Sequence, residues 1–110
     1  MEIAAIVAGT GFEGRAARIK TYARPGMAVI LEREPDNPHD SNAIAVYLHI
    51  RKWYTLFRNV PIHIGYIKRS RARAMVKRLD QGGKILSAKI NSMYTERDHP
   101  RVSLKIKTDW

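Results

Sequence analysis

The feature that most constrains the fold is a nine-residue polar segment, residues 34–42, between two short apolar runs. The runs, residues 29–31 and 43–46, are partly β-branched, which is typical of strands. The segment between them reads EPDNPHDSN, with two prolines and no glycine. Proline fixes φ and favours extended geometry in the residue before it, while Asn, Asp and Ser side chains bond to nearby backbone amides. We therefore expect two strands joined by a long, rigid, polar loop.

Two interpretations of this loop stay open on composition alone. A stiff polar loop held between buried strands is a good place for a binding site. The same residue types are also common in turns, where they only satisfy their own backbone.

The rest of the chain is predicted to be mostly strand. Residues 2–9 are apolar throughout and are expected to form a buried strand, after which Gly9, Gly11 and Gly14 give the backbone freedom. Residues 15–22 fit either a short helix or a strand, and Arg24-Pro25-Gly26 is typical of a turn. Further strands are expected at residues 62–67, with alternating sides, and at residues 84–94 and 101–107.

A helix is predicted over residues 69–80. Ala72, Met75, Val76 and Leu79 follow the spacing i, i+3, i+4, i+7 and form one apolar stripe. Gly82-Gly83 then supplies a left-handed stop. Strands with one or two helices predict a mostly β fold, a small OB/SH3-like β-barrel, and the length predicts a single domain over residues 1–110.

The charge is concentrated in the second part of the chain. The net charge is +10; residues 1–65 contain 8 basic and 6 acidic side chains, and residues 66–110 contain 12 basic and 4 acidic. A cationic surface attracts polyanions, nucleic acid first and anionic membrane second, although it also occurs as a solvated face without a ligand.

The composition also bears on location. The chain has no cysteine, so disulfides and thiolate metal sites are excluded and a reducing compartment is expected. It has no apolar run long enough to cross a bilayer and no basic secretory signal region. We expect a soluble cytoplasmic protein without a membrane partner; the oligomeric state is left open.

Enzyme motifs are scarce. The four histidines have no Cys partners and no H-E-x-x-H spacing, and there is no G-x-S-x-G or P-loop. Four carboxylates lie close together in sequence and suit Mg²⁺, which keeps a metal-dependent nucleic-acid hydrolase as an alternative. They are Glu32, Glu34, Asp36 and Asp40. No further acidic cluster completes a two-metal site, so we expect no enzyme, no metal and no cofactor.

Residues suited to binding are easier to find. Tyr66, Lys68 and Arg69 combine an aromatic face with cations where a strand enters a helix, and helix N-terminal amides favour anions. Tyr66 also suits a half-buried core position. Residues 51–61 interleave aromatic and basic side chains, which fits either base stacking or a small satellite core.

Three stretches together resemble the HIRAN domain family. Residues 32–44, EREPDNPHDSNAI, are similar to its R-E-P-x-N-P-x-D-x-N-A-I signature, residues 7–12 resemble its first strand and turn, and residues 64–67, IGYI, resemble its I-G-Y/H strand. A helix and the LDQG ending at residues 79–82 follow in the family's order. The resemblance covers about residues 3–90.

This resemblance implies a small β-barrel with added helices that binds single-stranded DNA and captures its 3′ end. HIRAN domains occur fused to helicase-type remodelling ATPases and to nucleases, and also alone in bacteria and phages. We expect a stand-alone bacterial or phage-like member, acting in DNA repair with a helicase or nuclease partner. A protein-interaction module that docks an acidic partner is the alternative from another class.

The resemblance also implies roles for the loop residues. Asp40 accepts a hydrogen bond from the terminal 3′ hydroxyl and repels a 3′ phosphate. Asn37 holds the loop and the edge of the terminal nucleotide, and His39 stacks on a base. Asn42 is expected to close the turn.

Outside the loop, the resemblance places Tyr66 near the DNA backbone, and Arg69 with Lys68 against a phosphate. Family members that grip a 3′ end have an Arg–aromatic pair just after the first strand. Here those positions are Thr10 and Gly11, and only Phe12 supplies an aromatic ring. This departure favours general single-strand affinity over strict 3′-end specificity.

Overall fold

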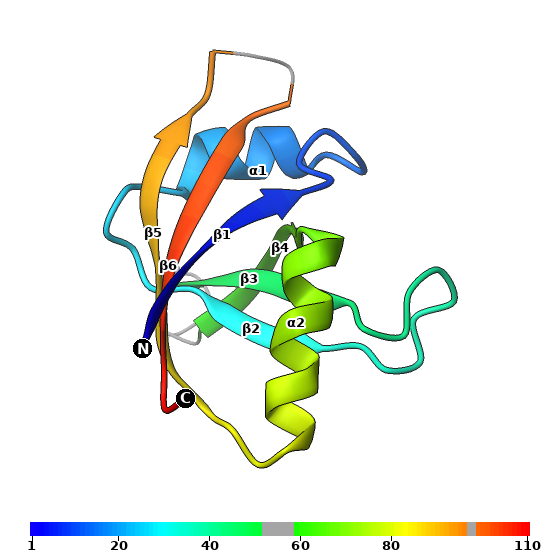
Figure 1. The fold of residues 1–110 in the computed structure, drawn as a ribbon. Coiled ribbons are helices and arrows are strands. Elements are labelled where there is room, and N and C mark those ends of the chain that lie inside the picture. Colours follow the sequence, from blue (N-terminus) through cyan, green and yellow to red (C-terminus); the bar gives the residue numbers. More distant parts are fainter. Residues whose placement is uncertain (52–58, 97–98) are drawn as a thin grey trace.

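The computed structural model describes residues 1–51, 59–96 and 99–110 (Figure 1). Its described strands pair antiparallel in the order β2-β3-β4-β1-β6-β5. The elements are β1 (Glu2–Ala8), α1 (Arg15–Tyr22), β2 (Ile30–Arg33), β3 (Ile44–Arg51), β4 (Asn59–Ile67), α2 (Arg69–Asp80), β5 (Ile85–Tyr94) and β6 (Arg101–Thr108). The predicted mostly β fold is confirmed, and residues 15–22, which fitted helix or strand, are helical.

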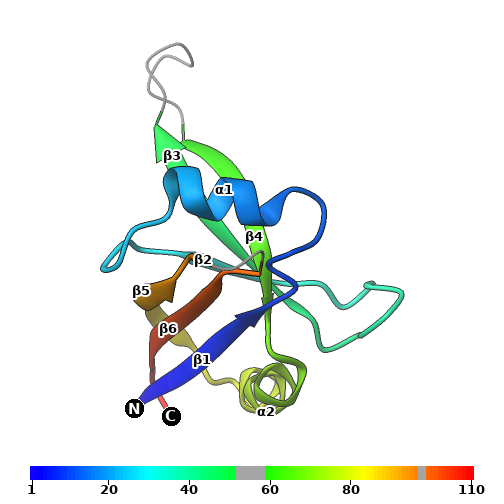
Figure 2. The ribbon, with the colours of Figure 1, turned by 90° about the horizontal axis from the view of Figure 1, so that it is seen from above.

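The sheet curls so that its two edges approach each other (Figure 2). The edge strands β2 and β5 form no continuous ladder within the described residues, but the segment leading into β2 hydrogen-bonds to β5. The Gly26 amide donates to the carbonyl oxygen of Ile90 at 2.7 Å, and the Val29 amide donates to that of Ala88 at 3.0 Å. The sheet is therefore a barrel that is not fully closed.

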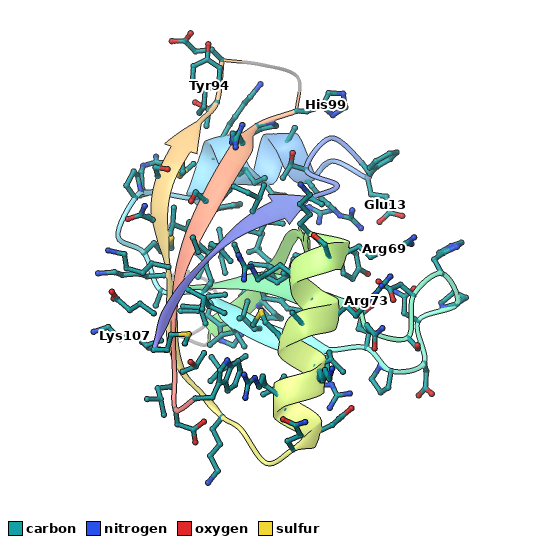
Figure 3. The ribbon with its side chains drawn as sticks, in the orientation of Figure 1. Glu13, Arg69, Arg73, Tyr94, His99 and Lys107 are labelled. Atoms are coloured by element: carbon teal, nitrogen blue, oxygen red, sulfur yellow. The ribbon has the colours of Figure 1, made fainter. Side chains whose placement is uncertain are left out.

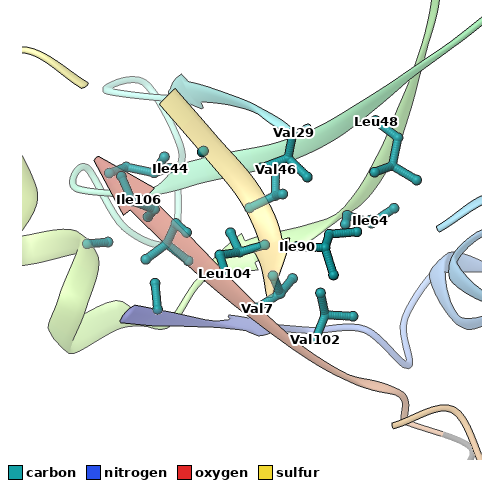
Figure 4. Close-up of a cluster of buried hydrophobic side chains, with 14 of the residues drawn as sticks. Val7, Val29, Ile44, Val46, Leu48, Ile64, Ile90, Val102, Leu104 and Ile106 are labelled. Atoms are coloured by element: carbon teal, nitrogen blue, oxygen red, sulfur yellow. The ribbon is translucent and has the colours of Figure 1, made fainter. Parts of the chain in front are cut away.

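The core lies inside this curl (Figure 4). In β6, Val102, Leu104 and Ile106 are fully buried and alternate with more exposed residues, as expected for a strand with one face inward. The same alternation corrects the prediction for residues 2–9. Only Ala5 and Val7 of β1 are buried, because the other face of the strand is outside the barrel.

Both helices pack on this sheet through short apolar stripes. α2 buries Ala72, Met75 and Val76, as its periodicity predicts, and Gly82 ends it with φ of 94°. α1 buries Ile19 and contacts β4. Both helices cover the ends of the curled sheet, and both begin close to the loops described below (Figures 1 and 2).

The strict alternation predicted for residues 62–67 is wrong in its middle. The pairing of β3 with β4 passes from Val46–Gly65 to Tyr47–His63, so Ile64 is an extra residue in a β-bulge. A bulge places two successive residues on one side of the sheet. Ile64 and Gly65 are both buried, and the residues on either side of them share the outer face.

Next to the aromatic stretch at residues 51–61, the strand predicted at residues 62–67 is longer in the structure. β3 continues to Arg51 and β4 begins at Asn59. Trp53, Tyr54 and Phe57, the candidates for base stacking in this stretch, lie outside the described residues.

Candidate nucleic-acid interface

A pocket of about 510 Å³ lies where three parts of the chain meet. The turn between β1 and α1, the loop after β2, and the junction between β4 and α2 each supply part of its wall. Figure 3 shows Glu13 from the turn and Arg69 from α2 on the side of the molecule that carries the loop. The lining residues are Ala8, Gly9, Phe12, Glu13, Arg15, Glu34, Asn37, His39, Asp40, Ala43, Tyr47, His63, Tyr66, Ile67 and Arg69.

The loop after β2 is held in shape chiefly by Asn37. Its side-chain oxygen accepts hydrogen bonds from the amides of His39, at 2.9 Å, and Asp40, at 3.2 Å. Its side-chain amide donates to Glu34 Oε1 at 3.0 Å. One side chain thus fixes both ends of the turn, and the loop is ordered by its own polar residues. The same loop lines the pocket.

Asp40 is positioned from both sides of its carboxylate. Oδ1 accepts a hydrogen bond from the Asn42 amide at 2.9 Å, and Oδ2 lies 3.4 Å from Arg69 Nε. Asn42 therefore takes part in closing the turn, as predicted, through its backbone. The Arg69 side chain is 68% exposed and the Asp40 side chain 19%. An exposed pair of this kind adds at most about 1 kcal/mol of stability, so its importance lies in where it places the two charges.

The bulge in β4 brings two rings to the pocket. His63 and Tyr66 meet edge to face with centroids 4.9 Å apart, and the Tyr47 ring lies 5.0 Å from that of His63. The Tyr66 hydroxyl donates to Glu34 Oε1 at 3.0 Å, so Glu34 connects the sheet to the loop. Burial, and then the hydrogen bond to Glu34, raise the pKa of Tyr66 above its ordinary value, and its hydroxyl is a donor at neutral pH.

Arg15 places a guanidinium behind this aromatic group. It is buried, donates from Nη1 to the Gly9 carbonyl oxygen at 3.0 Å, and lies 5.3 Å from the centre of the Tyr66 ring. Its ion pair, at 3.3 Å, is with the largely exposed Glu13. Among the residues that the structure describes, its Nε has no hydrogen-bond partner. Arg15 therefore fixes the turn and contributes positive charge to the pocket wall.

Most of the residues predicted to bind DNA come together in this pocket. Those that line it are Phe12, Asn37, His39, Asp40, Tyr66 and Arg69. Lys68 does not line it: this residue is exposed at the start of α2, where its amide donates to the Ile6 carbonyl oxygen. The DNA-binding roles themselves stay predictions.

The departure after the first strand has a structural reason. Thr10 is buried, and its hydroxyl donates to the Pro100 carbonyl oxygen at 2.6 Å. At Gly11, any added Cβ would overlap the His99 ring. These two positions pack against the segment before β6, so they leave no room for larger side chains in the present arrangement.

Two further observations concern metals and membranes. No group of three or more His, Cys, Asp or Glu side chains within residues 1–51, 59–96 and 99–110 is arranged to hold a metal ion. None of the described helices is long and apolar enough to cross a membrane.

His63 should make stability depend on pH. Burial first, and then the Arg15 charge, lower its pKa, although the Gly65 carbonyl and Glu34 favour the protonated ring. The unfolded chain therefore binds the proton more readily. The contribution of His63 to the free energy of unfolding is therefore complete above its unfolded pKa of about 6.5. It is lost as the pH falls through that value towards the lower folded pKa. Urea denaturation at neutral and mildly acidic pH should show this loss, and His63→Gln should reduce it. An unchanged pH dependence in the variant would contradict this role.

Such a curled antiparallel sheet, with a pocket that combines aromatic rings, cations and a fixed carboxylate, defines a small binding domain of the OB-like class. A profile of the HIRAN domain matches residues 3–110, and the chain belongs to the HIRAN domain family. HIRAN domains are nucleic-acid-binding domains and not catalytic ones.

Two crystal structures are similar to this fold. A protein from Lactobacillus plantarum aligns with a TM-score of 0.64 and 25% identity, over 96% of this chain and 97% of that one. The HIRAN domain of human HLTF aligns with a TM-score of 0.62 and 20% identity, over 96% and 74% of the two chains, which shows the shared OB-like fold. No curated protein sequence matches significantly.

Proposed function

We propose that this domain binds single-stranded DNA and holds the 3′-hydroxyl end in the pocket. The observation that carries the proposal is the placement of Asp40 next to Arg69 at a pocket lined by aromatic rings. A volume of about 510 Å³ is that of a small-molecule site, which suits the end of a strand and not a duplex. The resemblance to HIRAN domains that capture 3′ ends supports the same conclusion.

Each wall of the pocket offers a different part of the nucleotide its partner. The Asp40 carboxylate accepts a hydrogen bond from the 3′ hydroxyl, and its charge repels a 3′ phosphate. Arg69 neutralises a backbone phosphate. Its contacts with Asp40 and with the His39 carbonyl oxygen, both 3.4 Å, are long for charge-assisted hydrogen bonds, so Arg69 can turn to the ligand at little cost. The Asn42 amide meanwhile keeps the Asp40 carboxylate in place. His39, Phe12 and Tyr66 supply aromatic faces on which bases stack.

The test compares 5′-labelled single strands that end in a 3′ hydroxyl or a 3′ phosphate, and a blunt duplex, by fluorescence anisotropy at low and high salt. We expect the 3′-hydroxyl strand to bind about tenfold or more tightly than the 3′-phosphate strand, a difference of about 1.4 kcal/mol. Asp40→Ala should remove this preference. Asp40→Asn keeps an oxygen for the Asn42 amide but loses the charge, so it should bind the 3′-phosphate strand better than the wild type does.

Asp36→Ala is the matched control, because Asp36 is an exposed carboxylate of the same loop that does not line the pocket. Equal, salt-sensitive binding of all three ligands would leave a general polyanion binder and no role for Asp40 in end recognition. Absence of salt-sensitive binding would favour an interaction module for an acidic protein. Mg²⁺-dependent cleavage lost in Asp40→Ala would favour the hydrolase.

The wider setting belongs to the same proposal. HIRAN domains fused to helicase-type ATPases and nucleases imply that this domain, acting as one unit over residues 1–110, presents a strand end to such a partner during DNA repair in the cytoplasm.

A further inference from the structure

α2 carries a row of cations that continues beyond the pocket. Arg69, Arg73 and Lys77 are spaced four residues apart, so they lie on the same side of the helix, and all three are exposed. We call them the α2 stripe. It starts at the pocket, which Arg69 lines. At the rise of an α-helix, the stripe extends along the axis for about 12 Å. Figure 3 shows Arg69 and Arg73 on successive turns of α2.

The charges beyond the pocket are not used within the fold. The neighbouring acidic residue Asp80 pairs with Arg33 at 2.9 Å, and Asp40 pairs with Arg69. Arg73 and Lys77 form no ion pair with the residues that the structure describes. Like charges four residues apart on a helix are destabilising by about 0.2–0.5 kcal/mol. A polyanion bound along the stripe would be attracted by these cations and would offset their mutual repulsion.

The rim of the pocket formed by the β1–α1 turn differs in charge from the rim formed by α2. Glu13 stands at the β1–α1 turn and lines the pocket, and its side chain is 76% exposed. Its carboxylate pairs with Arg15 at 3.3 Å, so the two charges offset each other and this rim attracts a phosphate backbone less than the α2 stripe does. A strand whose end lies in the pocket is therefore drawn out on the side of α2. Lys and Arg contacts to phosphates are independent of sequence, and each adds to affinity and salt dependence.

We propose that the α2 stripe binds the phosphates that lie on the 5′ side of the nucleotide in the pocket. This inference rests on the proposed function, since it needs a strand whose 3′ end occupies the pocket. The stripe then acts as a track that sets how many nucleotides the domain covers, and affinity rises with oligonucleotide length until the track is filled.

The test is length dependence in a double variant, Arg73→Gln with Lys77→Gln. The ligands are 5′-labelled oligonucleotides with free 3′ hydroxyls: a dinucleotide, a tetranucleotide and an octanucleotide. The matched control is Arg71→Gln with Arg78→Gln, which removes the same charge from the same helix. Arg71 and Arg78 are exposed but lie on another side of α2, beside Met1 and Trp110.

We expect the stripe variant to bind the octanucleotide about tenfold more weakly than the wild type and to bind the dinucleotide equally well. The slope of log affinity against log salt for the octanucleotide should fall by about one for each cation removed. The control variant should change both ligands equally and by less. Octanucleotide binding at wild-type strength, or an equal loss in the control, would overturn the track while leaving the pocket in place. Failure of the wild type to prefer 3′-hydroxyl ends would overturn the proposed function and the track together.

Discussion

Gly65→Ala is expected to lower the free energy of unfolding by about 2–6 kcal/mol, the sum of backbone strain and overpacking. A Cβ at this position would lie 2.5 Å from the Ala8 carbonyl oxygen and 2.6 Å from Val7 Cγ1. The backbone φ of 150° is also one that side-chain-bearing residues rarely adopt. β1 and β4 pair here through only two residue pairs among the described residues, Val7 with Ile67 and Ala8 with Tyr66. The clash therefore falls where the two halves of the sheet join.

Gly26→Ala separates the two causes. Gly26 has φ of 85°, and nothing lies within 4 Å of the position that a Cβ would take there. The substitution therefore carries only the conformational cost, about 1–2 kcal/mol, without the clash. Urea denaturation of both variants measures the difference. Similar losses of unfolding free energy in the two variants would show that the close approach of β1 to β4 does not contribute to the effect of Gly65→Ala. We also expect Gly65→Ala to weaken DNA binding, because the residues on either side of the bulge line the pocket.

The parts of the fold with strong local patterns could be predicted from the sequence. The apolar stripe of Ala72, Met75 and Val76 defines α2 residue by residue, since helix periodicity depends only on neighbours one turn apart. The polar loop was also predictable, because Asn and proline act on the backbone within a few residues. The same local chemistry places Asn37, His39 and Asp40 together at the pocket.

Residues that reach the pocket through pairing between strands could not be predicted in this way. From the sequence, His63 matches no metal-binding motif and has no other role, and Tyr47 is assigned to no site. Glu34 is considered only as the start of the polar loop and as one of the four carboxylates that suit Mg²⁺. The positions of the Tyr47 and His63 rings depend on the bulge opposite Tyr47, which shifts the register of β4 by one residue. A bulge is a property of two paired strands, and one strand's sequence carries little sign of it except Gly65.

Arg15 shows a second limit of prediction from sequence. Arginine is rarely buried, so an arginine that starts a short basic helix is expected to be solvated. Here the turn fixed by Gly9 and Gly14 directs it under Tyr66 instead. Both glycines have left-handed backbone, with φ of 73° and 77°. Glycines at this spacing signal that the chain can double back, but not what it covers.

Asn37→Ala is expected to reduce affinity for a 3′-hydroxyl strand by about tenfold or more and to lower stability by about 1–3 kcal/mol. The substitution removes three hydrogen bonds: two from the amides of His39 and Asp40, and one to Glu34. The two amides would then need water as a partner, and the loop would sample many shapes before binding. Ordering it again costs free energy that the rigid loop of the wild type does not spend.

Anisotropy with the 3′-hydroxyl and 3′-phosphate strands, together with urea denaturation, separates the two effects. Asp36→Ala, one residue away and exposed, should leave both measurements near those of the wild type. Asn37→Asp retains the acceptor for both amides but replaces the donor to Glu34 with a second carboxylate. It should therefore destabilise the connection that Glu34 makes between loop and sheet more than the turn itself. If Asn37→Ala kept wild-type affinity at reduced stability, the loop would be structural only. Weaker affinity with an unchanged preference for 3′-hydroxyl ends would instead show that Asp40 still recognises the end once the ligand has ordered the loop. Discrimination would then depend on the Asp40 charge, and affinity on the shape that Asn37 imposes.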